Sequence, residues 1–191
     1  MKKVLSIILI AVFFFCSCED VNKEHIKTAY NYLCDASVEL ENISDIIQTA
    51  WHYGIYNTTD SIEDNVRGLE SKTGISAKEL LSGAFRAVML EEIDNQEFKT
   101  PAVCVYACIR AMGDSFESVS ESINKAKDEI QIINSNNNDY ESIKKYYSDA
   151  LTFYEWLKKP DGNYNQAIDT INDYNNKLKE HKNDLKLDYG D

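Results

Sequence analysis

Residues 26–50 read IKTAYNYLCDASVELENISDIIQTA, and their apolar residues recur in steps of three and four without interruption. The positions that keep this spacing are Ile26, Ala29, Leu33, Ala36, Leu40, Ile43, Ile47 and Ala50. Because an α-helix turns once every 3.6 residues, this spacing places the eight side chains on one face. Such a face buries one seam against neighbouring helices at shallow crossing angles. The stretch therefore predicts a long helix packed in a helical bundle.

Two later segments keep the same spacing. Their seams are Val105, Ile109, Met112, Phe116, Val119, Ile123, Ala126, Ile130 and Ile133, and then Tyr140, Ile143, Tyr147, Ala150, Tyr154 and Leu157. No alternating pattern typical of a β-strand reaches a comparable length. Two prolines and seven glycines are also few for a fold with many turns. These observations favour an all-α fold.

The helix boundaries are indicated by capping signals. Four pairs have the form of a capping box, in which the first side chain accepts from the third backbone amide of the helix. They are Asp60 with Glu63, Ser76 with Glu79, Asn138 with Glu141, and Asn163 with Gln166. Thr100 before Pro101 indicates a fifth start, and Gly74 and residues 159–162 (KPDG) indicate ends.

We therefore predict helices over residues 22–56, 60–71, 77–95, 101–135, 139–159 and 164–187. The first and fourth would each extend about 50 Å at 1.5 Å per residue. The fifth and sixth are joined by a tight turn and predict an antiparallel hairpin. The expected fold is an elongated bundle of four long antiparallel helices with two shorter helices at one end or on one side. Residues 22–191 would form this single domain.

The N-terminal segment, MKKVLSIILIAVFFFCSCED over residues 1–20, has the form of an export signal. Lys2 and Lys3 precede a 12-residue apolar stretch from Val4 to Phe15 that only Ser6 interrupts. About 20 apolar residues are needed to span a bilayer as a helix, so this stretch has the length of a signal peptide.

The end of that segment, Phe15-Cys16-Ser17-Cys18, resembles a bacterial lipoprotein signal, in which a small residue directly precedes an acylated cysteine. The resemblance implies that residues 1–17 are a signal peptide that is removed. Cys18 would carry fatty-acyl chains of the palmitate type, and residues 18–21 would form the lipid anchor and a short acidic linker. A plain secretory signal followed by a stray cysteine is the alternative.

Two acidic residues, Glu19 and Asp20, follow the cysteine. In some Gram-negative lineages such acids resemble a tag for export to the outer face of the outer membrane. In others an acid at the second position resembles a tag for retention in the inner membrane. A pair of acids leans toward the outer membrane, with the periplasmic face of the inner membrane as the alternative.

The chain is strongly acidic, with 20 basic and 32 acidic residues. Loss of Lys2 and Lys3 with the signal would leave 18 basic residues and a net charge of −14. A surface this acidic repels phosphate backbones, so we expect no nucleic-acid partner. The membrane would be contacted through the acylated Cys18.

Three further cysteines are Cys34, Cys104 and Cys108. Cys104 and Cys108 stand four residues apart, which suits two metal ligands on one helix face. A zinc site needs about four nitrogen or sulfur ligands, however, and the three histidines are scattered singly. Burial as small apolar side chains is the favoured interpretation, and we expect neither a metal nor a cofactor.

The patterns of common catalytic sites are absent from the sequence. The residues three before the histidines are Asn22, Thr49 and Leu178, so no Glu-x-x-His pair for a di-iron site exists. GxSxG, HExxH and glycine-rich phosphate loops are also missing. No catalytic residue is assigned, and an enzyme is the least supported of the functions considered.

Aromatic residues give the strongest indication of an interaction surface. On a helical projection of residues 140–157, Tyr146 and Phe153 lie on the shoulder of the seam and Trp156 lies outside it. Tyrosine and tryptophan combine apolar area with a polar tip, which suits a partner surface. Coverage of this shoulder by a neighbouring helix is the alternative. Separately, Asp60-Ser61-Ile62 resembles a bacterial O-glycosylation signal, with Ser61 as the acceptor.

Two functions from different classes follow from these features. The first is a non-enzymatic cell-envelope lipoprotein whose helical bundle binds another protein or scaffolds a complex. The second is a lipoprotein that holds a small molecule between its helices, which polar residues in the interior would favour.

Overall fold

The computed structural model describes residues 2–57, 59, 61–89 and 101–190, and it describes side chains from residue 21 onward apart from residues 62, 88 and 89. These residues contain no strand and form seven helices: α1 (Lys2–Tyr56), α2 (Ile62–Thr73), α3 (Ala77–Met89), α4 (Pro101–Ala111), α5 (Gly113–Ile132), α6 (Tyr140–Lys158) and α7 (Tyr164–Tyr189). The prediction of an all-α fold is confirmed.

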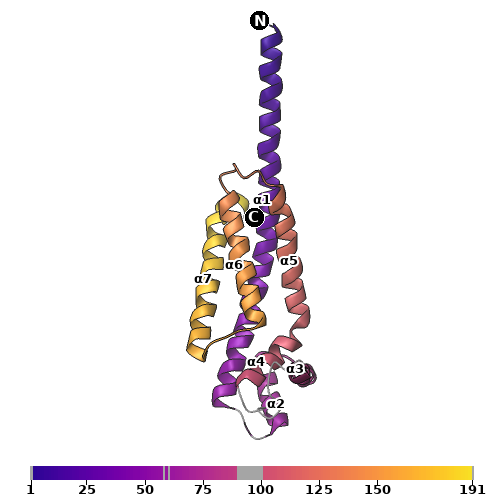
Figure 1. Cartoon of the computed structure of the whole chain (residues 1–191), viewed down its shortest axis with the longest axis vertical. Helices are drawn as coiled ribbons and strands as arrows, with labels where there is room; N and C mark the ends of the chain where they lie inside the picture. Colours follow the sequence, from indigo (N-terminus) through magenta and orange to yellow (C-terminus); the bar gives the residue numbers. More distant parts are fainter. Residues whose placement is uncertain (1, 58, 60, 90–100, 191) are drawn as a thin grey trace.

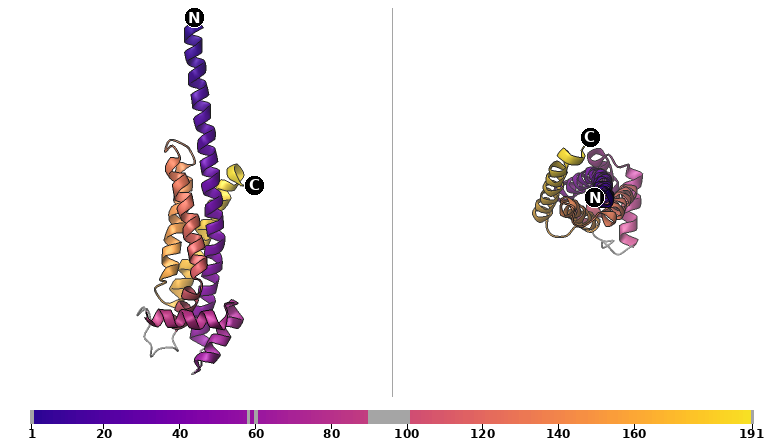
Figure 2. Two further views of the ribbon diagram at one scale, coloured as in Figure 1. Left: turned by 90° about the vertical axis from the view of Figure 1, so that its right-hand side faces the viewer. Right: turned by 90° about the horizontal axis from the view of Figure 1, so that it is seen from above.

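Helix α1 is the element around which the others pack. It contacts α2, α4, α5, α6 and α7, and the view along the molecule shows it between the other long helices (Figure 2). Its eight predicted seam residues are all buried, with at most 1% of each side chain exposed. The three–four spacing of residues 26–50 therefore identified the centre of the core.

The long helices lie along α1, and the short helices gather at one end. Helices α1 and α6 run in one direction, and α5 and α7 run in the other (Figure 1). Helices α2, α3 and α4 lie at the end where α1 finishes, far from the N-terminus (Figure 1). Helix α1 is continuous from Lys2, whereas the sequence-based prediction starts it at residue 22.

The predicted helix over residues 101–135 is divided into α4 and α5. The backbone leaves helical geometry at Met112, with φ −85° and ψ 25°, and α5 begins at Gly113. Glycine is a weak helix former, which makes this position a low-cost place for a break. The whole predicted seam, from Val105 to Ile133, stays buried across the break. The prediction of two short helices is therefore wrong, because the first part of this segment is a third short helix.

Two predicted capping boxes are present in the structure. The Glu79 backbone amide donates to Ser76 Oγ, and the Ser76 amide donates to Glu79 Oε2. At the start of α7, Asn163 and Gln166 make the same reciprocal pair. Pro101 is the first residue of α4, as predicted, and Thr100 lies outside the described residues.

The other two predicted starts differ by one residue. Ser61 caps α2 by accepting from the Asp64 amide, whereas Asp60 lies outside the described residues. Asp139, not Asn138, precedes α6, and its side chain makes no capping hydrogen bond. Its carboxylate instead accepts a hydrogen bond from the Tyr189 hydroxyl at the end of α7.

Gly74 ends α2 as predicted, and α6 ends at Lys158, just before the predicted stop at residues 159–162. Gly74 follows α2 with φ +74°, and its amide donates to the Glu70 carbonyl. Gly162, in the turn between α6 and α7, has φ +89°. Both values lie in the left-handed region, where a Cβ atom is unfavourable.

Helices α3 and α4 approach each other closely at Gly83. A Cβ atom added there would stand 2.2 Å from the Ala107 carbonyl oxygen and 3.1 Å from the Ala111 amide nitrogen. Only a hydrogen atom fits in this space, so Gly83 sets the distance between the two helices.

We expect Gly83→Ala to destabilise the fold by about 1–3 kcal/mol, because the added methyl group forces α3 and α4 apart. Gly113→Ala is the matched control, since a Cβ atom there meets nothing within 4 Å. Its effect should lie between zero and a gain of about 1 kcal/mol. Urea unfolding of the two variants measures both values. Equal losses of stability would contradict the proposed packing.

Candidate functional site

The aromatic residues expected at a partner surface are largely buried. Tyr146 and Phe153 have no exposed surface. Phe153 stacks on Tyr174 of α7, with ring centroids 5.1 Å apart. Trp156 is half-buried, and its indole Nε1 donates to Asp161 Oδ1 at 2.9 Å. The proposed surface of Tyr146, Phe153 and Trp156 is therefore wrong for its first two members, which a neighbouring helix covers.

The buried face of α6 differs from the predicted one by a small rotation. The observed seam is Ile143, Tyr146, Ala150, Phe153 and Leu157. It shares Ile143, Ala150 and Leu157 with the predicted seam and keeps the same spacing. Tyr147 and Tyr154, which were predicted to be in the seam, are half-buried. Periodicity alone fits both faces, so contacts with other helices decide between them.

Hydrogen bonds connect Tyr146 of α6 to α1. The Tyr146 hydroxyl lies 2.8 Å from Ser37 Oγ and donates to the Leu33 carbonyl of α1 at 3.2 Å. Burial raises the pKa of Tyr146 far above its ordinary value, so the phenol stays neutral and able to donate. The Tyr146 hydroxyl therefore has hydrogen-bond partners inside the core. Tyr147 is half-buried at the edge of the helix.

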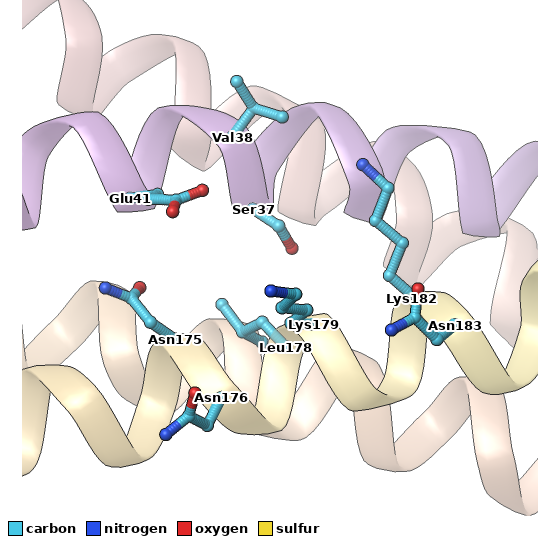
Figure 3. A pocket seen from close by; sticks show the side chains of 9 residues that line it. All are labelled: Ser37, Val38, Glu41, Asn175, Asn176, Leu178, Lys179, Lys182 and Asn183. Carbon is cyan, nitrogen blue, oxygen red and sulfur yellow. The ribbon is translucent and has the colours of Figure 1, made fainter.

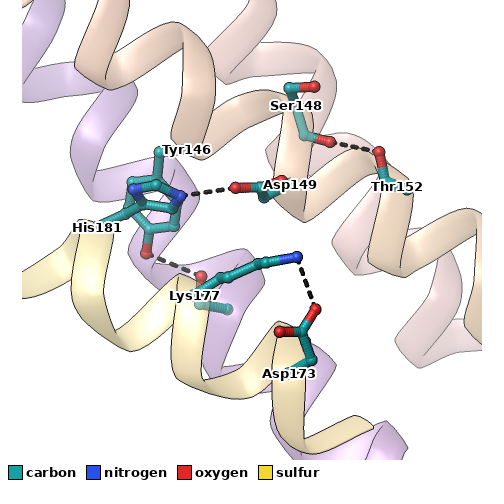
Figure 4. Close-up of polar contacts among 8 residues, drawn as sticks. Tyr146, Ser148, Asp149, Thr152, Asp173, Lys177 and His181 are labelled. Atoms are coloured by element: carbon teal, nitrogen blue, oxygen red, sulfur yellow. Dashed lines mark hydrogen bonds and ion pairs between the residues drawn. The ribbon is translucent and has the colours of Figure 1, made fainter. Parts of the chain in front are cut away.

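His181 of α7 extends this polar interior toward α6. Its ring lies 5.6 Å from the Tyr146 ring, and Nε2 lies 2.7 Å from Asp149 Oδ2 (Figure 4). Only 9% of the His181 side chain is exposed. On the outer side of α7, Lys177 and Asp173 form an ion pair at 2.6 Å (Figure 4). The interior of the bundle thus contains polar groups that the apolar seams did not predict.

A groove of about 440 Å³ lies between α1 and α7, beside this polar interior. Figure 3 shows its two walls, with Ser37 and Glu41 of α1 facing α7. The residues that line it are Ser37, Val38, Glu41, Asn175, Asn176, Leu178, Lys179, Lys182 and Asn183. Most of these side chains are polar or charged, and Lys179 and Lys182 bring two cations into it.

Hydrogen bonds between the two helices fix the width of the groove. Asn175 Nδ2 donates to Ser44 Oγ at 3.2 Å. The Tyr30 hydroxyl donates to the Lys182 backbone carbonyl at 3.2 Å. Both bonds connect α1 to α7, and Tyr30 and Ser44 lie on either side of Ser37 in the sequence. The groove is therefore held by interactions at both ends rather than by loose packing.

The groove is suited to binding a polar group. Asparagine side chains both donate and accept hydrogen bonds, and lysines supply positive charge. Leu178 is buried at its base, so the contact would not be entirely polar. Sequence reasoning missed this site. The cluster Asn172, Asn175, Asn176 and Asn183 in α7 was the signal that could have indicated it.

The histidines act as links between helices in this structure. His25 Nδ1 lies 2.5 Å from Glu129 of α5, and His52 lies 3.4 Å from the Tyr164 hydroxyl of α7. Together with the pair of His181 and Asp149, these contacts join α1 to α5, α1 to α7 and α7 to α6. In the described part of the chain, the hydrogen-bond partners of the histidine rings are Glu129, Tyr164 and Asp149, and none is a serine or cysteine.

The cysteines are located as follows. Cys104 and Cys108 are buried, as predicted, with 2% and 0% exposed. Burial raises the pKa of Cys104 to about 11 and that of Cys108 further, so both thiols stay protonated at neutral pH. Cys34 is half-buried, and its Sγ lies 3.9 Å from the Tyr146 hydroxyl. The described residues contain no cluster of three or more side chains suited to a metal ion.

The structure does not test two of the predicted modification sites, Cys18 and Ser61. The side chain of Cys18 lies outside the described residues. Ser61 Oγ accepts from the Asp64 amide at 3.2 Å, and the side chains on either side of Ser61 also lie outside the described residues. Lipidation of Cys18 and glycosylation of Ser61 stay predictions.

Comparisons with known proteins add no assignment: no family model, no curated protein and no solved structure matches this chain. Within the described residues, no helix combines the length and the apolar character that crossing a membrane requires.

The corrected seam predicts different costs for two neighbouring aromatic residues. Phe153→Ala empties a fully buried site, so we expect it to lower the free energy of unfolding by about 3–5 kcal/mol. Trp156→Ala removes a half-buried ring and one exposed hydrogen bond, so we expect a loss of about 1–2 kcal/mol. Urea unfolding of both variants measures the difference. A larger loss for Trp156→Ala would show that the core lies on the other face of α6.

Proposed function

We propose that this chain is a lipid-anchored protein of a bacterial cell envelope whose helical domain binds a partner rather than catalysing a reaction. The observation that carries the proposal is the N-terminal sequence, in which a 12-residue apolar stretch leads to Ser17 and Cys18. Residues 1–17 would be removed, and residues 22–191 would act as one binding domain. The outer membrane is the favoured location, with the periplasmic face of the inner membrane as the alternative.

Acylation accounts for membrane attachment without a spanning helix. Each buried methylene group contributes about 0.8 kcal/mol, and one acyl chain alone binds only marginally. A triacylated Cys18 would therefore be a stable anchor. Because α1 contains both Cys18 and the buried seam of residues 26–50, the anchor would be continuous with the central helix of the bundle.

The groove between α1 and α7 is the surface that we propose for the partner. Ser37 follows Cys18 by 19 positions, which corresponds to about 30 Å along a helix. A groove at that height would lie beyond the lipid headgroups, where a polar segment of another envelope protein can reach it. Its asparagines and lysines would pair with the polar and acidic groups of such a segment.

A small-molecule function is the second candidate. The groove volume of about 440 Å³ falls within the range of about 300–1,000 Å³ for small-molecule sites. Such sites are mainly apolar with a few polar groups, whereas this groove is mainly polar. A small ligand would therefore have to be polar itself, and a protein segment is favoured.

The anchor predicts distinct outcomes for the two N-terminal cysteines. Cys18→Ser should leave the precursor uncleaved and without lipid, because the acylated residue is lost. Cys16→Ser should be processed normally, because that residue would leave with the signal. Mass spectrometry of the mature N-terminus distinguishes the two. Acyl chains on Cys16, or none on either cysteine, would contradict the proposed anchor.

The groove can be tested by photo-crosslinking in native envelopes. A benzoylphenylalanine in place of Glu41, which faces the groove, should give a discrete protein adduct. The same probe at Leu187, which is 93% exposed near the end of α7, is the positional control and should not. Lys179→Glu in the groove should abolish the adduct, and Lys127→Glu on the exposed surface of α5 should not.

Two results would argue against a protein partner in the groove. One is an adduct at Leu187 of equal intensity, and the other is an adduct that Lys179→Glu does not affect. Absence of any adduct, together with thermal stabilisation of the purified protein by a polar metabolite extract, would favour the small-molecule alternative.

A further inference from the structure

Large apolar side chains from three helices are exposed at the end of the bundle nearest the N-terminus. They are Val21 of α1, Ile132 of α5 and Leu187 of α7, and each is at least half exposed. Ile132 is the last residue of α5, and Leu187 lies two residues before the end of α7. Both helices end beside the part of α1 that leads to the N-terminus (Figure 1). We call this end of the bundle, formed by residues 21–25, 130–140 and 186–190, the proximal end.

Hydrogen bonds between the segments hold the proximal end together. The Asn134 backbone amide donates to Asn22 Oδ1 at 3.1 Å, which joins the loop after α5 to α1. The Asp139 amide donates to Asn137 Oδ1 within that loop. The Tyr189 hydroxyl donates to Asp139 Oδ2, which joins the end of α7 to the start of α6. The ends of four helices are therefore connected at the level of Asn22.

The loop of the proximal end is uncharged. Residues 130–138 read IQIINSNNN, although 27% of the residues of the whole chain are charged. Asn134, Ser135 and Asn136 are exposed. Asparagine and serine side chains can donate hydrogen bonds to phosphate and ester oxygens of lipids. Such a loop can approach a headgroup layer without the high cost of removing a charge from water.

Charges of both signs flank the exposed apolar residues. Lys23 and Glu24 follow the exposed residue of α1, and Lys186 and Asp188 stand on either side of Leu187; all four are exposed. A lysine stem can lie along an apolar surface while its ammonium group reaches a phosphate. Because acids stand beside the lysines, we expect contact with zwitterionic lipid and no requirement for anionic headgroups.

The distance from Cys18 indicates what lies against the proximal end. Four positions separate Cys18 from Asn22, and α1 is helical between them. At 1.5 Å per residue this corresponds to about 6 Å. The headgroup region on each side of a bilayer is roughly 5–8 Å thick. An acylated Cys18 would lie within this region, and a tilt of α1 would only shorten the separation. The proximal end would therefore not clear the headgroups.

We propose that the proximal end is a membrane-contact surface, in which Val21, Ile132 and Leu187 lie among the lipid headgroups and the first methylene groups of the acyl chains. This inference rests on the proposed acylation of Cys18. Apolar side chains at the membrane interface add to the binding that acyl chains provide. Three contacts from three helices define a plane across the bundle. The contact therefore holds α1 upright and keeps the groove between α1 and α7 at a constant height above the lipid.

Quenching of tryptophan emission by brominated lipid measures this contact, because bromine quenches only at short range. The native residues Trp51 and Trp156 lie near the ends of α1 and α6 that point away from the N-terminus (Figure 1). They provide a background that brominated lipid should not change. The mature acylated protein is reconstituted into phosphatidylcholine vesicles with bromine on the upper acyl chain, and into the same vesicles without bromine. Ile132→Trp and Leu187→Trp should each lose most of the emission of the added tryptophan.

Two control variants separate contact from simple tethering. Phe85→Trp places the probe at an exposed position of α3, at the opposite end of the molecule, and should lose no emission. In the Leu187→Trp protein, Ile132→Glu should reduce the quenching, because the added carboxylate resists entry into the lipid. Leu81→Glu makes the same kind of change on exposed α3 and should leave the quenching as it was. Circular dichroism checks the helical fold of each variant.

Mass spectrometry of the same sample separates failure of this inference from failure of the proposed anchor. Acyl chains on Cys18 with unquenched probes at positions 132 and 187 would leave the anchor intact and overturn the contact. Absence of acyl chains from Cys18 would overturn both. Quenching at only one of the two proximal positions, or equal quenching of Phe85→Trp, would also contradict an end-on contact, since the bundle would then lie along the membrane.

Discussion

Burial of the apolar seam of α1 is the interaction on which the rest of the structure depends. Its side chains from Ile26 to Ala50 are almost completely removed from water, and five other helices pack against the helix that carries them. Burial of each large apolar side chain contributes about 1.5–3 kcal/mol. The seam is continuous, so the long helices α5, α6 and α7 align with α1 (Figure 1). The long shape of the molecule follows from that alignment.

Much of this fold could be predicted from sequence, because the local rules and the tertiary packing agree in α1, α5 and α7. The seams of residues 26–50 and 105–133, the cap at Asn163 and the end at Gly74 need only helix geometry and glycine stereochemistry. The break at Met112 was not predictable in the same way. The apolar spacing continues without change across Met112, because the seam stays buried on both sides of the break. Periodicity therefore could not indicate that the helix ends there.

The face of α6 was the other point that periodicity could not resolve. Tyr146 and Tyr147 both continue a three–four spacing, and the structure buries the one whose hydroxyl meets Ser37 and Leu33 of α1. That choice depends on a partner more than 100 residues away in the sequence. The pair of His181 and Asp149 and the hydrogen bond between Asn175 and Ser44 also join different helices, so the sequence did not predict them. Polar pairs between helices carry no local signal, so the groove beside them was also missed.

The placement of charge suggests how an acidic protein can still bind anionic groups. Five cations of the described surface form an ion pair with an acid one turn away on the same helix, where each pair contributes only a few tenths of a kcal/mol. Such pairs neutralise each other and leave the surface acidic. Lys179 and Lys182 instead line the concave groove between α1 and α7. Because an acidic surface repels anions elsewhere, this groove is where an anionic group of a partner would be attracted and oriented.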